Sequence, residues 1–333
     1  MYLKKCITFC FLLLFSLISY AKENTLKFGD FLPATTVTNR VIIPTFIEKV
    51  AELSDGQLKV KHYPGGILGS GGKIQLDLIE KAVLDIAEVV TPYTPGRVRG
   101  LDVLELPYLF SNELEGAKIA QYLGDQGLVK GLDKFKVLGY QEVGPYIIHS
   151  AKKIEKLDDI RGLKFRVVGA AQSEIIRRLG GIPVSNITAP QIAENLHRGV
   201  IDGALMDMGN VYNFKMNDVT KYHVVNLYLG GNAIVFPMTK KKFSQLSKKS
   251  QQALEQVSQG WFTELIGKET LKQSQEAYAK MKAEGGHHFV MLSPRDLEKA
   301  EIILQAYQDE WRIKTSENHK LYDAVMNYKK TQQ

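Results

Sequence analysis

The sequence predicts an α/β protein of two domains, each with a mostly parallel sheet flanked by helices, and with a cleft between them. Three observations support this prediction. The chain has 333 residues, which suits two domains of ordinary size. Strand-like apolar segments alternate with amphipathic helical segments over residues 25–90 and again over 146–207. A helical stretch at 248–282 is longer than one domain is wide, so we expect a helix that bridges both domains.

Residues 1–21 have the pattern of a secretory signal peptide that is cleaved after Ala21. Two lysines precede the apolar run CITFCFLLLFSLISY, which ends in a small-x-small segment, SYA. The alternative is a membrane anchor, but the run is shorter than the ~20 residues that a spanning helix needs. We therefore expect export to a bacterial periplasm.

The first α/β unit contains three predicted strands and two predicted helices. TLKFGDFLP alternates as a strand does and ends in turn residues. Residues 38–53 carry apolar side chains at helical spacing, with Pro44 in or near the first turns of the predicted helix. After the turn SDG, the pattern predicts a strand in QLKVKHYP, a short helix in IQLDLIEKA and a strand in VLDIAEVV. This alternation favours parallel strands.

The second unit repeats the alternation without repeating the sequence. Strands are predicted in YIIHS, GLKFRVV and VIDGALMD, and helices in AAQSEIIRRLG and APQIAENLHRG. The last third of the chain is predicted to be helical. Its final long helix is expected to begin at SPRD, where Ser293 is the N-cap residue and Pro294 the first helical position.

Composition and charge narrow the classes of function. Both cysteines, Cys6 and Cys10, lie in the leader, so the mature chain has no disulfide, thiol nucleophile or cysteine-based zinc site. The formal net charge is +7, with basic residues scattered along the chain. The densest group, KKKFSQLSKKS at 240–250, has helical spacing and is expected to be a solvated face. We therefore expect no nucleic-acid partner.

Motifs for enzymatic chemistry are missing or incomplete. The glycine-rich GGILGSGGK has Ile67 and Ile74 where a phosphate-binding loop needs Gly and Ser or Thr. Neither G-x-S-x-G nor H-E-x-x-H occurs, and the neighbouring His287 and His288 would point apart on a helix. Asp202 fits a turn or strand end better than a catalytic acid. We expect no catalytic residue, no metal and no cofactor.

Arg166 lies in the apolar segment GLKFRVVG, where a buried guanidinium needs a negative partner. It is near the carboxyl end of its predicted strand, where α/β sheets bind ligands. A guanidinium matches a carboxylate through two parallel hydrogen bonds, which lysine does not reproduce. The residues alone leave two readings open, a ligand carboxylate or an internal salt bridge.

Five segments, in order, resemble the DctP family, the solute-binding subunits of tripartite ATP-independent periplasmic (TRAP) transporters. The segments, which together span essentially the whole mature chain, are ELSDGQLKVKHYPGGILGSGG, VLELPYLF, KLDDIRGLKFRVVG, LHRGVIDG and FKMNDVTKYH. The resemblance implies a periplasmic-binding-protein fold that closes by a hinge on a small organic acid. It also implies delivery of that acid to a membrane permease powered by an ion gradient.

The resemblance places the family's carboxylate-clamping arginine at Arg166. It implies that residues 22–143 plus about 232–272 form domain I, and that 144–231 plus about 273–333 form domain II. It further implies a binding protein rather than an enzyme, and we expect a monomer.

Two departures from the family pattern bear on the ligand. Many members that bind sugar acids or dicarboxylates follow VDG with Gln-Glu-Asn, where this chain has ALMD at 204–207. Such members also carry a second arginine near the position of Tyr146. Both changes replace polar groups by apolar or aromatic ones, so we expect a monocarboxylate with an apolar or aromatic body.

Further pocket residues are expected on loops beyond strand ends. Besides Arg166, Tyr146 and Met206, the candidates are Phe31, Tyr93, Asp207 and Asn210. The alternative is that Phe31 belongs to the core and Tyr93 to a surface turn, or that polar contacts from Asp207, Asn210 or Tyr93 favour a more polar ligand. Arg97 is expected in a loop or a salt bridge.

Two other functions remain open at this point. An exported α/β enzyme could use Arg166 as an anchor for a carboxylate and Asp207 as a base. A binding protein with the same clamp could report to a membrane sensor instead of a permease. Turnover of a carboxylate distinguishes the first, and the neighbouring genes distinguish the second.

Overall fold

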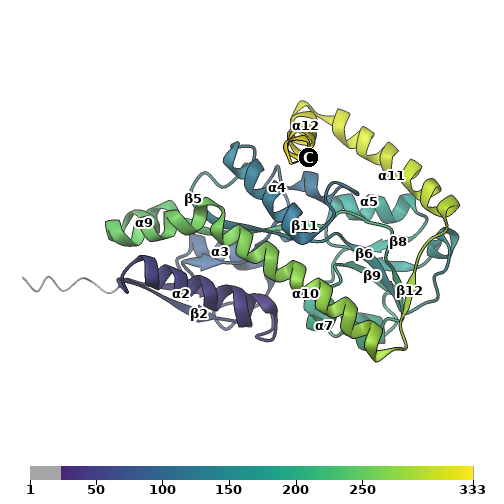
Figure 1. Cartoon of the computed structure of the whole chain (residues 1–333), viewed down its shortest axis with the longest axis horizontal. Helices are drawn as coiled ribbons and strands as arrows, with labels where there is room; N and C mark the ends of the chain where they lie inside the picture. The colour runs from purple at the N-terminus through teal and green to yellow at the C-terminus, as the bar shows by residue number, and fades with distance from the viewer. Residues whose placement is uncertain (1–23, 333) are drawn as a thin grey trace, which may run out of the picture.

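The computed structural model describes residues 24–332, so the predicted signal peptide lies outside the described part of the chain. Helices pack around three sheets in an α/β arrangement, and α10 (Phe262–Glu284) runs diagonally across the molecule (Figure 1). The predicted α/β class is confirmed. No helix within this part is long and apolar enough to cross a membrane.

The first unit contains two small sheets of different kinds. A parallel sheet has the order β2-β1-β3, and an antiparallel sheet has the order β4-β11-β5. Their strands are β1 (Asn24–Gly29), β2 (Leu58–Tyr63), β3 (Ile86–Ala87), β4 (Val89–Val90), β5 (Phe135–Val143) and β11 (Asn232–Thr239). The segment VLDIAEVV therefore supplies two short strands to two different sheets, where the sequence predicts one strand. The sequence analysis did not predict β5 or β11.

The second unit contains one mixed sheet of order β12-β10-β6-β9-β7-β8. Strands β7 and β9 are parallel, as predicted, and β8, which was not predicted, is parallel to β7, whereas β6 is antiparallel to both of its neighbours. The strands are β6 (Ile147–Ser150), β7 (Lys164–Arg166), β8 (Ile182–Val184), β9 (Gly203–Met206), β10 (Tyr222–Val224) and β12 (His288–Val290).

The helices cover these sheets and largely follow the predicted positions. Besides α10, they are α2 (Ile43–Leu53), α3 (Gln75–Glu80), α4 (Glu113–Asp125), α5 (Ala170–Arg178), α6 (Ile192–His197), α7 (Asn210–Asn213), α8 (Lys240–Ser244), α9 (Lys248–Gln256), α11 (Pro294–Lys314) and α12 (Ser316–Thr331). Pro44 is the second residue of α2, and a π-helical segment, Thr38–Ile42, directly precedes this helix. The proline lacks a backbone N–H, so it donates no hydrogen bond to the preceding turn. The Ser293 side chain caps α11 by accepting from the Asp296 amide.

The helical stretch at 248–282 is not continuous. Gln259 and Gly260 have non-helical backbone angles, with φ of 99° at Gly260, and they separate α9 from α10. Beyond this kink, α10 packs against α4 and β5 of the first unit and against α7 of the second. The bridging helix is thus α10 alone.

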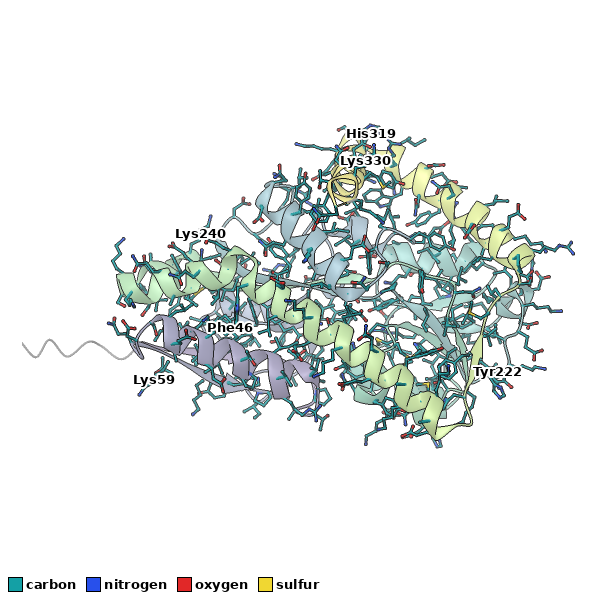
Figure 2. The ribbon with its side chains drawn as sticks, viewed as in Figure 1. Phe46, Lys59, Tyr222, Lys240, His319 and Lys330 are labelled. Atoms are coloured by element: carbon teal, nitrogen blue, oxygen red, sulfur yellow. The ribbon has the colours of Figure 1, made fainter. Side chains whose placement is uncertain are left out.

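An aromatic cluster fixes the start of α10 on the first unit. The rings of Phe46 and Phe262 lie 4.5 Å apart, and those of Phe236 and Phe262 lie 5.2 Å apart. Phe46 points from α2 toward the start of α10 (Figure 2). Ring pairs of this kind contribute about 0.5–1.5 kcal/mol each beyond their buried area. The cluster therefore connects α2, β11 and α10 in one core.

Two chain segments cross between the units side by side. The Tyr146 amide donates to the Gly230 carbonyl at 2.6 Å, and the Leu229 amide donates to the Tyr146 carbonyl at 2.8 Å. A Cβ on Gly144 would lie 2.9 Å from the Gly231 Cα, so this close approach requires glycine. Helix α10 also connects the same two units.

The C-terminal helices contact both units. Helix α11 packs against α5 of the second unit, while α12 packs against α4 of the first (Figure 1). The division of 273–333 into domain II stays a prediction.

Candidate ligand-binding site

A cavity lies between the two units, against one face of the antiparallel sheet. Because side chains alternate along a strand, one face presents one set of residues to this cavity. These residues are Glu88 and Val90 beside β4, Asn232 and Ile234 from β11, and Gln141 and Val143 from β5. The empty space inside the cavity and at its mouth is about 520 Å³. The enclosed part of this space is only about 50 Å³, below the range of small-molecule sites, so the two units close tightly on each other here.

Arg166 at the end of β7 borders this cavity and is 0% exposed. Its Nε donates to the Ile187 carbonyl at 2.9 Å, and its Nη2 donates to the Tyr93 hydroxyl at 3.0 Å. Its Nη1 has no hydrogen-bond partner among the described residues. The internal salt bridge left open by the sequence is therefore not formed. A buried, unpaired guanidinium nitrogen is costly unless a ligand meets it.

Tyr93 joins the two units over the cavity. It lies in the 3-10 turn Thr91–Tyr93 of the first unit, and its hydroxyl contacts two groups of the second. The hydroxyl accepts from Arg166 Nη2 and from the Ala189 amide at 3.1 Å. The Tyr93 side chain thus orients the Arg166 guanidinium from across the cavity.

Residues 28–314 match the family model DctP, described as bacterial extracellular solute-binding protein, family 7. The match covers most of the chain. The chain belongs to the DctP family. The resemblance drawn from the five sequence segments is thereby confirmed.

A curated relative is the C4-dicarboxylate-binding periplasmic protein DctP of Rhodobacter capsulatus, 27% identical over 196 residues. The match spans 57% of this chain and little more than half, 58%, of that relative.

Two solved structures show the same fold. One is a TRAP solute binding protein from an unidentified marine metagenome microbe, specific for aromatic acid ligands and bound to metahydroxyphenylacetate. It is 25% identical with a TM-score of 0.85, covering 92% of this chain and 98% of that one. The other, from Rhodoferax ferrireducens with copurified benzoate, is 21% identical with a TM-score of 0.84, covering 93% and 99%. The predicted two-domain fold of the DctP family is confirmed.

Six of the seven residues that the sequence singles out border the cavity of this DctP-family protein. They are Phe31, Tyr93, Tyr146, Arg166, Met206 and Asn210. Tyr146 is buried, and its hydroxyl donates to the Asn232 side-chain oxygen. Phe31 lies 6.1 Å from the Tyr93 ring, measured between centroids. That each of the seven contacts a ligand stays a prediction.

Asp207, the seventh residue, is not among the residues that line the cavity. Its carboxylate accepts from the Asn210 backbone amide at 3.2 Å and from the Asn210 side-chain amide at 2.8 Å. Burial raises the pKa of Asp207 to about 6, although these hydrogen bonds oppose the rise. In this structure Asp207 holds the start of α7, and Asn210 reaches the cavity.

Sequence reasoning missed several polar residues of the cavity, among them Glu88 and Gln141. Both oxygens of the Glu88 carboxyl and Oε1 of Gln141 are buried without a hydrogen-bond partner. Like Arg166, Glu88 is a charged residue inside an apolar strand segment, so the same sequence pattern could have identified it. Gln141 gives no such signal, because β5 was not predicted.

A larger hollow of about 1600 Å³ lies between the α5 end of the second unit and α11. Three of its charged residues form one ion-pair group: Arg178 contacts Glu310 at 2.6 Å and Glu174 at 2.8 Å. At the cavity beside Arg166, by contrast, the guanidinium forms no ion pair and its Nη1 has no hydrogen-bond partner among residues 24–332. That a ligand carboxylate binds at Arg166 stays a prediction.

Other charged residues considered in the sequence have structural partners. Arg97 pairs with Asp77 and Glu80, and Asp202 accepts from the Lys164 amide at 2.9 Å. His149 and His223 are buried with their Nδ1 atoms 2.7 Å apart, and burial lowers the pKa of His149 to about 4 and of His223 to about 2. Among residues 24–332, no group of three or more His, Cys, Asp or Glu is arranged to hold a metal.

Proposed function

We propose that this protein is the solute-binding subunit of a TRAP transporter and that it captures a small organic acid in the cavity at Arg166. The observation that carries the proposal is the Arg166 guanidinium, buried at the boundary of the two units with Nη1 unpartnered. A ligand carboxylate supplies the acceptor that this nitrogen lacks. Capture occurs by hinge closure, because the ligand binds the closed state more tightly than the open one.

The ligand proposed is a monocarboxylate with an apolar or aromatic body. Apolar side chains supply much of the wall beside Arg166, namely Phe31, Leu32, Val37, Val90, Val143, Met206, Phe214 and Ile234. The marine metagenome relative, which is specific for aromatic acid ligands, supports this class. The relative from Rhodobacter capsulatus, named for C4-dicarboxylates, makes dicarboxylates the main competing class.

The proposal includes export to the periplasm, action as a monomer, and delivery of the acid to a membrane permease driven by an ion gradient. The family description, a bacterial extracellular solute-binding protein, supports the location. The protein binds its acid without turning it over. Chemical change of a bound acid on incubation would favour the enzyme alternative. Neighbouring genes for a sensor kinase in place of a permease would favour the sensor alternative.

A thermal-shift screen tests the proposal. The protein without its leader is unfolded and refolded to remove copurified ligand, then heated with aromatic and aliphatic monocarboxylates, dicarboxylates and sugar acids. A ligand at 100 times its Kd adds about 2.7 kcal/mol of stability, which raises Tm by roughly 4 °C for a chain of this length. We expect this rise with apolar-bodied monocarboxylates. A rise with sugar acids or dicarboxylates alone would contradict the apolar pocket, and no rise with any acid would contradict the function.

Replacing Tyr93 with phenylalanine should weaken binding of the acid found in this screen. The change leaves Arg166 Nη2 and the Ala189 amide without their shared acceptor. An unsatisfied buried donor costs about 1–3 kcal/mol, so Kd should rise roughly 5- to 150-fold in a calorimetric titration. Tyr228→Phe is the matched control, since Tyr228 is 37% exposed and lies outside this cavity. Equal affinities of the two variants would mean that Tyr93 does not orient Arg166.

A further inference from the structure

The cavity holds more unpartnered hydrogen-bond acceptors than a simple monocarboxylate satisfies. Arg166 Nη1 is one unpartnered donor, and a ligand carboxylate meets it. Three acceptor oxygens remain, the two of the Glu88 carboxyl and Oε1 of Gln141. Both side chains belong to the sheet face that lines the cavity. Buried polar groups without partners are rare in folded proteins, so these three atoms call for an explanation.

Among residues 24–332, Glu88 has no hydrogen-bond partner that would explain its burial. The side chain is 0% exposed. Its charged neighbour Asp30 is fully engaged: it accepts from the Leu32 amide at 2.8 Å and from Asn39 Nδ2 at 3.1 Å, and lies 3.2 Å from His62 Nε2. Asp30 is itself acidic, so it repels an ionised Glu88 and offers it no countercharge. A role in folding therefore does not account for Glu88.

The protonation state of Glu88 indicates what kind of group it meets. Burial and the charge of Asp30 raise the pKa of Glu88 well above its ordinary value. A protonated carboxyl both donates and accepts. A hydroxyl has the same two capacities, so the two groups satisfy each other without burying a charge. An ammonium group would instead require Glu88 to ionise beside Asp30.

We propose that the ligand carries a hydroxyl group on its apolar body and that this hydroxyl hydrogen-bonds to Glu88, with Gln141 Oε1 as a second acceptor. Glu88 is then a specificity-determining residue, whereas Arg166 supplies the carboxylate clamp. Glu88 and Gln141 both border the cavity, which supports one ligand reaching both acceptors. Gln141 pairs with Ile234 of β11, and Glu88 lies two residues before Val90, which pairs with Ile234 from the other side. This inference rests on the proposed function, since it concerns the same cavity.

The test compares hydroxyl-bearing acids with their methyl analogues. The probes are the 2-, 3- and 4-hydroxy isomers of benzoate and phenylacetate, each beside the acid that has a methyl group at the same position. In the unaltered protein, at least one hydroxy acid should bind about 10- to 100-fold more tightly than its methyl analogue, as measured by calorimetric titration. Glu88→Leu should reduce this ratio to near one. Glu88→Gln should keep most of it, because a neutral amide still donates and accepts.

Glu142→Gln is the matched control. Glu142 also has two unpartnered carboxyl oxygens, but it follows Gln141 directly on β5 and therefore points away from the cavity. Its replacement should leave the ratio unchanged. We also expect the ligand-free Glu88→Leu protein to unfold at a higher Tm, because the unpartnered carboxyl is removed.

The outcomes separate this inference from the proposed function. Equal binding of hydroxy and methyl acids, or a ratio that survives in Glu88→Leu, overturns the role of Glu88 and leaves the carboxylate clamp intact. The probe 3-(aminomethyl)benzoate carries an ammonium group in place of the hydroxyl. If it binds more tightly than any hydroxy acid, and Glu88→Gln loses this binding, then Glu88 meets a cation and the hydroxyl proposal is overturned. If no carboxylate of any class binds the unaltered protein, the proposed function itself is contradicted, and the role of Glu88 falls with it.

Discussion

Replacing Arg166 with alanine is expected to weaken ligand binding by about 2–5 kcal/mol, or roughly 25-fold to several thousand-fold in Kd. The size follows from the burial of the guanidinium at 0% exposure. A ligand carboxylate that enters this cavity loses its water and then has no charged partner in the variant. The measurement is a calorimetric titration with the acid that gives the largest thermal shift.

Two further variants separate the clamp from a structural role of Arg166. Arg166→Met fills a similar volume without charge, so it should lose affinity as Arg166→Ala does while packing well. Arg166→Lys keeps the charge but lacks the fork, and it loses the Nε bond to the Ile187 carbonyl, so it should recover little affinity. Arg161→Ala is the control, since the Arg161 side chain is exposed and pairs only with Asp158. Undiminished affinity in Arg166→Met would show that the arginine serves the fold and not the ligand.

Sequence alone could predict Arg166 because the signal is local. A charged residue inside an apolar strand segment stands out, and the carboxyl end of that strand fixes where its side chain lies. Glu88 carries the same signal in VLDIAEVV, yet its role depends on which face of the sheet meets the cavity. That face is set by the pairing of β4 with β11, two strands more than 140 residues apart in sequence. Local periodicity contains no information about such a pairing.

For Asp207 the sequence predicts a ligand contact that the structure does not show. The family resemblance placed it near the ligand, whereas in the structure its carboxylate bonds to Asn210, three residues later. Short side chains of Asp and Asn often bond to nearby backbone in this way. The spacing was visible in the sequence, but it did not decide between a local cap and a ligand contact. The mixed order of the second sheet was hidden for a similar reason, because β6 pairs with β9 and β10, which lie more than 50 residues later in the sequence.

Glu105 is expected to make the stability of the protein fall as pH rises. It lies in the 3-10 turn Asp102–Glu105 and faces the start of α5 in the second unit, where the Ala171 amide donates to its carboxyl. Burial, and then the charge of Asp102, raise the pKa of Glu105 from 4.5 to about 8. Because the folded pKa lies above the unfolded one, the folded state binds more protons between these values. The free energy of unfolding therefore decreases as pH rises through this window.

The size of this effect is large for one side chain. A shift from 4.5 to about 8 corresponds to at most about 5 kcal/mol of stability, present below pH 4.5 and lost by pH 8. Glu105→Gln should remove this component, because the amide stays neutral while still accepting from the Ala171 amide. Urea unfolding from pH 5 to pH 8 measures it as the difference between the two proteins. Buried acids that do not sense Glu105, such as Glu113 with a pKa raised to about 7, contribute equally to both curves and cancel. Glu142 does not cancel completely, because the charge of Glu105 helps to raise the pKa of Glu142.

Glu298→Gln is the control for Glu105→Gln, since Glu298 is exposed and its curve should match that of the unaltered protein. Equal pH slopes for Glu105→Gln and the unaltered protein would mean that Glu105 is already ionised when the protein is folded. The N-terminal amides of α5 would then be what stabilises the charge, since a helix N-terminus favours an anion. In that case Glu105 would act as an ionic contact between the two units. If Glu105 is neutral in the folded protein, by contrast, the contact between the two units weakens when Glu105 ionises as pH rises.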